Sequence, residues 1–221
     1  MYFPKTLQAG AAPASRLLFA ILCLGLLGVC TSRLVYPFDV GQFEAAVWAP
    51  ALESIAGRNP YAYTLREPYI MAPYGYLYYL LVGVGLKLFG YQFWLGRLLA
   101  VVGALCCVRA CLRIVLSLTD GRREAAWFTA AMIAAAGPFQ IWLAVQRSDF
   151  IGLAFAFGGL AIAVLAARNA SPQSDRRALG MAFLFTAAFL CKLTLVLPTV
   201  AAIAWLLHQG RRREAVVLGA S

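Results

Sequence analysis

The stretch LLFAILCLGLLGVCT, residues 17 to 31, decides the fold class of this chain. It contains no charged residue, and similar apolar runs recur along the 221 residues, of which 62% are hydrophobic. A helix that crosses a bilayer needs about 20 apolar residues, whereas a helix in a soluble core needs neither this length nor this freedom from charge. The sequence therefore predicts an all-α, polytopic membrane helical bundle.

The basic residues indicate how the chain is threaded through the membrane. The net charge is +10, but the basic residues form short clusters between apolar runs, which is typical of topology signals and argues against a nucleic-acid partner. No small-x-small cleavage site follows the first run, so it is interpreted as an uncleaved span. With the N-terminus in the cytoplasm, the predicted spans are about 17–33, 95–118, 125–145, 150–167, 178–190 and 193–208.

One long segment, residues 34–94, is then placed outside, with surface helices at about 42–56 and 74–89. Tyrosines are dense between Tyr61 and Tyr79, as expected at a membrane interface. The predicted location is the bacterial plasma (inner) membrane, with multiple passes and the functional side facing outward. The chain ends in AVVLGAS, the opening of another apolar run, so we expect the N-terminal part of a longer protein.

Four charged residues at the predicted outer boundary are candidates for chemistry. Asp39 follows the first span and is either a general base or a helix cap, since Gln42 stands three residues later as in a capping box. Arg147 and Asp149 form either a local ion pair or a phosphate clamp with Asp149 as partner or cap. Lys192 interrupts an apolar run, which is costly and indicates function unless the side chain reaches the interface.

Further residues are weaker candidates. Glu44 is either a second acid or a solvated residue, Arg97 is a possible contact for lipid headgroups or a donor phosphate, and Tyr74 begins the second surface helix. The six cysteines lie in or beside apolar runs without zinc-type spacing and are interpreted as packing residues. His208, beside the cluster Arg211 to Arg213, is not expected to be catalytic.

The order of these parts resembles the GT-C superfamily of membrane glycosyltransferases. The residues that carry the resemblance are an acid just after the first span, GRNPY (57–61), a Tyr/Pro-rich segment, KLFG (87–90) before Arg97, RSDFIGLAF (147–155) and LCKLTLVLP (190–198). The chain is most similar to enzymes that use polyprenyl-phosphate-linked sugars, such as protein O-mannosyltransferases, aminoarabinose transferases and envelope mannosyltransferases. It departs from them in having a lone Asp39 in place of a diacidic signature and MAPYGYLYY (71–79) without His-Pro-Pro.

The resemblance implies a GT-C-like N-terminal module and an inverting hexosyl- or pentosyltransferase. Asp39 would be the general base, Arg147 and Lys192 would bind the donor phosphate, and Glu44, Asp149, Arg97 and Tyr74 would support them. No metal or other cofactor is expected, and the partners would be a polyprenyl-phosphate sugar, membrane lipids and a glycan, lipid or protein acceptor. The alternative is a polytopic transporter or lipid flippase without transferase activity, since broken helices and an intramembrane lysine also suit that class.

Overall fold

A computed structural model of the chain describes residues 5–40, 44–62, 64, 67, 69, 71–168 and 174–220, with side chains described from residue 16 onward. All regular secondary structure in these residues is helical. In chain order the helices are α1 (Lys5–Val35), the short 3-10 helix η1 (Ala45–Val47), α2 (Trp48–Ile55), α3 (Tyr76–Phe89), α4 (Phe93–Leu118), α5 (Arg123–Ala135), α6 (Gly137–Trp142), α7 (Asp149–Arg168), α8 (Asp175–Cys191), the 3-10 helix η2 (Leu193–Val196), α9 (Leu197–His208) and α10 (Arg212–Gly219). The all-α prediction is thus confirmed for the described residues.

Three of these helices are long and apolar enough to cross a membrane. They cover Arg16–Val35, Phe93–Leu118 and Asp149–Arg168, and correspond to the predicted spans 17–33, 95–118 and 150–167. Much of α1 has no protein neighbour, as Leu24 with 70% of its surface exposed illustrates. Large apolar side chains at this exposure are unfavourable in water and stable against lipid tails. Composition, length and exposure therefore agree on association with a membrane.

The prediction of one continuous helix over 125–145 is wrong. Helix α5 ends at Ala135, and the extended backbone of Ala136 (ψ 133°) separates it from the six-residue α6. Pro138 follows this break and cannot supply a backbone N–H to it, so it suits the first turn of a new helix. The predicted break at CKLT is present, because α8 ends at Cys191 and Lys192 is extended (φ −158°, ψ 118°). The predicted surface helices 42–56 and 74–89 appear as η1 with α2 and as α3, and Gln42 lies outside the described residues.

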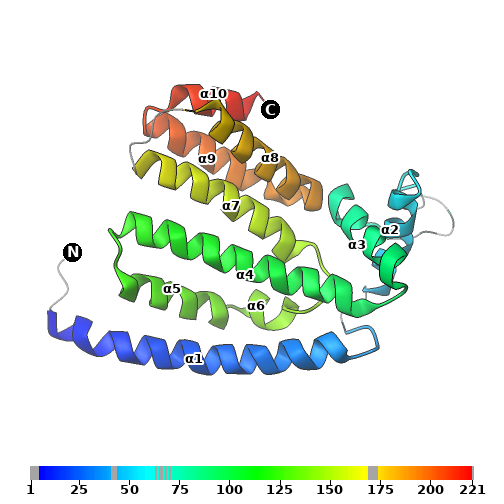
Figure 1. Ribbon diagram of the computed structural model, residues 1–221, viewed down its shortest axis with the longest axis horizontal. Coiled ribbons are helices and arrows are strands. Elements are labelled where there is room, and N and C mark those ends of the chain that lie inside the picture. The colour runs from blue at the N-terminus through cyan, green and yellow to red at the C-terminus, as the bar shows by residue number, and fades with distance from the viewer. Residues whose placement is uncertain are drawn as a thin grey trace.

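Helices α4 and α7 pack along each other in the middle of the molecule (Figure 1). Helices α5 and α1 lie beyond α4, and α8, α9 and α10 lie beyond α7. The α4–α7 contact is close because Gly103 faces backbone: a Cβ at this position would lie 2.6 Å from Ile151 N. Small residues permit this close approach of the two backbones. Within a bilayer, where the hydrophobic effect does not drive helices together, such close packing favours helix association.

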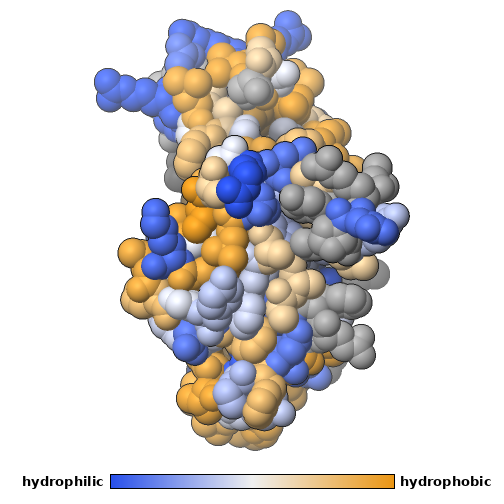
Figure 2. Space-filling model, turned by 90° about the vertical axis from the view of Figure 1, so that its right-hand side faces the viewer, coloured by the Kyte–Doolittle hydropathy of each residue, from blue (hydrophilic) through white to orange (hydrophobic). Residues whose placement is uncertain are grey.

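The pair α2 and α3 lies at one end of the bundle, where α1 ends and α4 and α7 begin (Figure 1). We call this end the α2/α3 end. Figure 2 looks onto it and shows blue hydrophilic residues set among orange hydrophobic ones. The candidate charged residues lie at this end.

Candidate functional site

The loop between α6 and α7 is the centre of the α2/α3 end. It runs from Leu143 to Ser148, and its backbone is strained at the buried Ala144, whose φ of 55° is unfavourable for a residue with a Cβ. Arg33, in the last turn of α1, donates from Nη1 to the carbonyls of Ile141 (2.8 Å) and Leu143 (2.7 Å). These bonds satisfy acceptors that the end of α6 leaves open, and they fasten the loop to α1.

A charged cluster of Arg147, Asp149 and Lys192 follows this loop. Arg147 Nε donates to Asp149 Oδ2 at 2.9 Å, and Lys192 Nζ donates to Asp149 Oδ1. The guanidinium carbon of Arg147 lies 3.9 Å from the ring centre of Trp142, in cation–π geometry. The three side chains are 28%, 23% and 30% exposed. The cluster is therefore accessible, and its two cations share one carboxylate.

Backbone packing brings the start of α3 against Lys192. Gly75 N donates to Cys191 O at 2.8 Å, and a Cβ on Gly75 would lie only 2.0 Å from Leu190 O. Only glycine fits so close to this backbone. The contact places Tyr74, which is 9% exposed, beside the charged cluster. Burial raises the pKa of Tyr74, an effect that the positive charge of Arg147 opposes and the carboxylates of Asp149 and Glu44 reinforce.

A buried ion pair between Glu44 and Arg97 holds the neighbouring loop. Arg97 Nε donates to Glu44 Oε1 (2.9 Å) and Nη2 donates to Oε2 (2.7 Å), with the two side chains 0% and 1% exposed. The remaining N–H groups of Arg97 donate to the carbonyls of Arg33, Tyr36 and Phe38, each at 2.6 Å. All five donors are thus used within the protein. Arg97 therefore orders the chain between α1 and η1. Because its side chain is fully buried, it cannot contact a donor phosphate, which corrects that expectation.

Glu44 is buried, which corrects the expectation of a solvated residue. Its Oε2 accepts from Val40 N and its Oε1 from Gln146 N, each at 2.7 Å, and its carbonyl accepts from Gln146 Nε2 at 3.0 Å. Burial by itself raises the pKa of Glu44, but the hydrogen bonds from Arg97, Val40 and Gln146 outweigh it and hold the pKa below its usual range. Glu44 therefore remains ionised and joins this loop to the α6–α7 loop.

Asp39 lies on the loop that Arg97 orders. Its Oδ2 accepts from Ala45 N, the first residue of η1, at 3.2 Å. Asp39 is not the N-cap residue of η1, which is Glu44, and Gln42 of the predicted capping box lies outside the described residues. Asp39 is half-buried, and its link to Arg147 is indirect. Its partner Ala45 follows Glu44 in the chain, and Glu44 accepts from the backbone N–H of Gln146, the residue before Arg147.

Three buried polar atoms near the charged cluster have no hydrogen-bond partner within the described part of the chain. They are Gln146 Oε1, Ser148 Oγ and Tyr78 Oη. Gln146 and Ser148 flank Arg147 in the loop, and the Tyr78 ring makes an edge-to-face contact with Tyr74 at 5.3 Å. Buried polar groups normally have a partner, so this concentration suits a place that receives water or a polar ligand. No sequence pattern indicated these atoms.

An aromatic pocket of about 470 Å³ adjoins the loop that carries Asp39. Leu34 to Pro37 form one side of it, and the other side consists of Gln92 and four aromatic residues: Trp48, Tyr91, Phe93 and Trp94. Trp48 stacks on Phe93 with the ring centres 4.6 Å apart. Aromatic faces of this kind suit an apolar chain or the apolar face of a sugar ring.

Of the predicted site residues, the structure brings Arg147, Asp149, Lys192 and Tyr74 together and connects Asp39 to them through Glu44. It places Arg97 and Glu44 in the buried pair. No group of three or more His, Cys, Asp or Glu side chains that could hold a metal ion occurs in the described residues. Comparison of the chain with protein-family models, curated proteins and solved structures finds no match.

Proposed function

We propose that the protein is a membrane glycosyltransferase of the GT-C type that moves a sugar from a polyprenyl-phosphate donor to an acceptor outside the membrane. The observation that carries this proposal is the meeting of Arg147 and Lys192 on the single carboxylate of Asp149, at the end of apolar helices. Two cations and one acid leave one positive charge uncompensated. That excess, at the depth of a lipid headgroup, suits a phosphate.

The donor phosphate would bind between Arg147 and Lys192. Within the described contacts Arg147 uses only Nε toward Asp149, so its outer N–H groups can face phosphate oxygens, and Lys192 has further donors. As negative charge grows on the leaving phosphate, both cations stabilise it. In the absence of the donor, Asp149 would hold the side chains of Arg147 and Lys192 in position through one hydrogen bond to each.

Asp39 would act as the general base. It removes the proton from the acceptor hydroxyl while the oxygen attacks the anomeric carbon. The bond from that carbon to the phosphate oxygen breaks with both electrons going to the phosphate, so the configuration inverts. Arg97 and Glu44 act as positioning residues, because they fix the loop on both sides of Asp39. The aromatic pocket beside this loop gives room for the sugar or for the first isoprene units.

The proposed topology has a cytoplasmic N-terminus, multiple passes through the plasma membrane and the α2/α3 end facing outward. It rests on the sequence clusters and on the three spanning helices. Single cysteines at Met71 and Gln92 in a background without the native cysteines should react with an impermeant maleimide added to whole cells. Protection of the Gln92 position would contradict the external assignment of α3.

Substitution of Asp39 tests the catalytic proposal. Asp39→Asn retains an oxygen for the Ala45 cap but removes the base, so sugar transfer in membranes should fall by about 10²- to 10⁴-fold with the protein still folded. Asp120→Asn is the matched control, because Asp120 is 85% exposed and lies after α4, at the opposite end of the bundle. Lys192→Ala should mainly raise the donor concentration needed for half-maximal rate. Full transfer by a folded Asp39→Asn variant would refute the role of Asp39 as base.

A transporter or lipid flippase is the second candidate, favoured by the helix breaks at Ala136 and Lys192. Transport of a labelled lipid-linked sugar without its consumption would support this class. Consumption of the donor that depends on Asp39 would exclude a pure transporter.

A further inference from the structure

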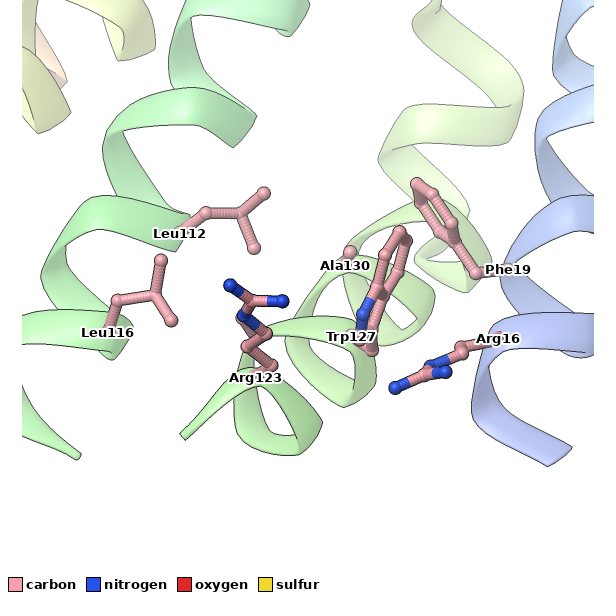
Figure 3. A pocket seen from close by; sticks show the side chains of 8 residues that line it. Arg16, Phe19, Leu112, Leu116, Arg123, Trp127 and Ala130 are labelled. Atoms are coloured by element: carbon pink, nitrogen blue, oxygen red, sulfur yellow. The ribbon is translucent and has the colours of Figure 1, made fainter. Parts of the chain in front are cut away.

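A cavity lies at the end of the bundle opposite the charged cluster. It has a volume of about 640 Å³ and is formed by the start of the apolar part of α1, the end of α4 and the start of α5 (Figure 3). Two arginines line it, Arg16 from α1 and Arg123 from α5. Nothing in the proposed transferase mechanism uses this cavity.

The side chains that line the cavity carry two positive charges and no carboxylate. Figure 3 shows the guanidinium groups of Arg123 and Arg16 on the two sides of the Trp127 ring. Both arginines are exposed, and among the described residues no carboxylate forms an ion pair with either of them. The N-terminal chain up to Arg16 contains no acidic residue that could do so. A planar guanidinium group can donate two parallel hydrogen bonds to an oxyanion, so each arginine is suited to a phosphate oxygen at the mouth of the cavity.

An apolar groove lies next to this cavity. A second cavity of about 400 Å³ shares Phe19 and Ala130 with the first and follows α1, α4 and α5 toward the middle of the bundle. Its lining consists of apolar side chains and extends along α1 from Phe19 to Cys30. Eleven residues of helix correspond to about 16 Å. The basic site therefore adjoins an apolar groove of a length suited to part of an acyl chain.

We propose that this composite site binds one anionic phospholipid, with its headgroup at Arg16 and Arg123 on the two sides of Trp127 and one acyl chain in the groove. A free phosphate would use the arginines but not the groove, and a zwitterionic lipid would bring a cation next to them. Trp127 suits the level of the lipid headgroups, where indole rings are stable. The bound lipid would cover apolar side chains of α1 and so add to the contacts that α1 makes with α4 and α5.

The test measures lipid retention by native mass spectrometry. The full chain is purified in mild detergent, mixed with either phosphatidylglycerol or phosphatidylcholine, and the fraction with one lipid bound is followed over a titration. Phosphatidylglycerol should bind preferentially to the wild type. Loss of one arginine from an anionic lipid site weakens binding by about fivefold, so the double variant Arg16→Gln/Arg123→Gln should bind about 30-fold more weakly.

The matched control is Arg109→Gln/Arg113→Gln. It removes the same charge from exposed positions in the second half of α4, and neither residue lines the cavity. This control should bind phosphatidylglycerol like the wild type. Arg16→Lys/Arg123→Lys keeps both charges and should retain most of the binding, which separates loss of charge from loss of folding.

Two outcomes would overturn the proposal. Equal weakening in both Gln double variants would show that phosphatidylglycerol responds only to the net charge at this end. Displacement of phosphatidylglycerol by inorganic phosphate at comparable concentration would show a phosphate site in which the groove has no part. Neither outcome bears on the transferase proposal, because Asp39, Arg147 and Lys192 lie at the other end of the bundle.

Discussion

Removal of Arg97 should destabilise the protein more than removal of any exposed arginine. In Arg97→Met the carboxylate of Glu44, which is 1% exposed, loses its counter-ion, and the carbonyls of Arg33, Tyr36 and Phe38 lose their donors. Breaking one side of a buried ion pair costs about 3–5 kcal/mol. For a chain of this size about 1 kcal/mol lowers the melting temperature by about 2–4 °C, so we expect a decrease of about 10 °C.

The assay is thermal unfolding in mild detergent, followed by circular dichroism at the helix band. Arg213→Met is the control: Arg213 is 66% exposed and pairs with Asp175, which is 49% exposed, so its loss should cost no more than about 1 kcal/mol. Addition of Glu44→Gln to Arg97→Met removes the buried charge and should recover part of the lost stability. Equal effects of Arg97→Met and Arg213→Met, or losses that simply add in the double variant, would refute the reasoning.

Three further predictions concern packing, pH and a second buried ion pair. Gly103→Ala should destabilise the protein by about 1–3 kcal/mol, because its Cβ would lie 2.6 Å from Ile151 N, whereas Gly180→Ala, with nothing within 4 Å, should be neutral or slightly stabilising in the same melting assay. Because the pKa of Glu44 is lower in the folded protein than its ordinary value of 4.5, ionised Glu44 stabilises the fold at pH values above 4.5, and this stabilisation is lost as the pH falls further. Glu44→Gln should therefore make the melting temperature depend less on pH on the acid side. An unchanged pH profile would contradict this prediction. Arg211 is 6% exposed and donates to Glu214 at 2.6 and 2.9 Å and to Ala166 O at 3.1 Å. Arg211→Met should therefore lower the free energy of unfolding by about 3–5 kcal/mol, whereas Arg212→Met, at an exposed position, should change it very little. Similar melting temperatures for the two variants would rule out a structural role for the Arg211–Glu214 pair.

Arg211 shows what a basic cluster in a sequence leaves undecided. Arg211 belongs to a basic cluster that was interpreted as a topology signal, and Arg212 and Arg213 are indeed exposed. Arg211 instead turns inward to Glu214, which also accepts from Ser174 N at 3.0 Å, and so ties α10 to α7 and α8. Three adjacent arginines look identical in a sequence, and only the direction of each side chain on the folded helix separates them.

The sequence by itself determined the features that depend on short segments. Long apolar runs predicted α1, α4 and α7, since span length follows from bilayer thickness. The interruption at Lys192 predicted the end of α8, and the spacing of Arg147 and Asp149 allowed the ion pair that the structure contains. The break at Ala136 was missed, because Pro138 at the start of a short helix was not distinguished from a proline within a continuous apolar run.

Only the tertiary structure decided which charged residues meet. Glu44 and Arg97 are 53 residues apart, and Asp149 and Lys192 are 43 apart, so no local pattern could pair them. The choice depends on how closely the helices approach, which glycines such as Gly75 and Gly103 set through backbone contacts that a Cβ would prevent. Burial then separates the roles: the 0% exposure of Arg97 makes it a structural partner, while the 28% and 30% exposure of Arg147 and Lys192 leaves them free to contact a ligand. A low-dielectric interior commits a buried charge to one partner, whereas a charge at the surface of the bundle can exchange its partner for a phosphate.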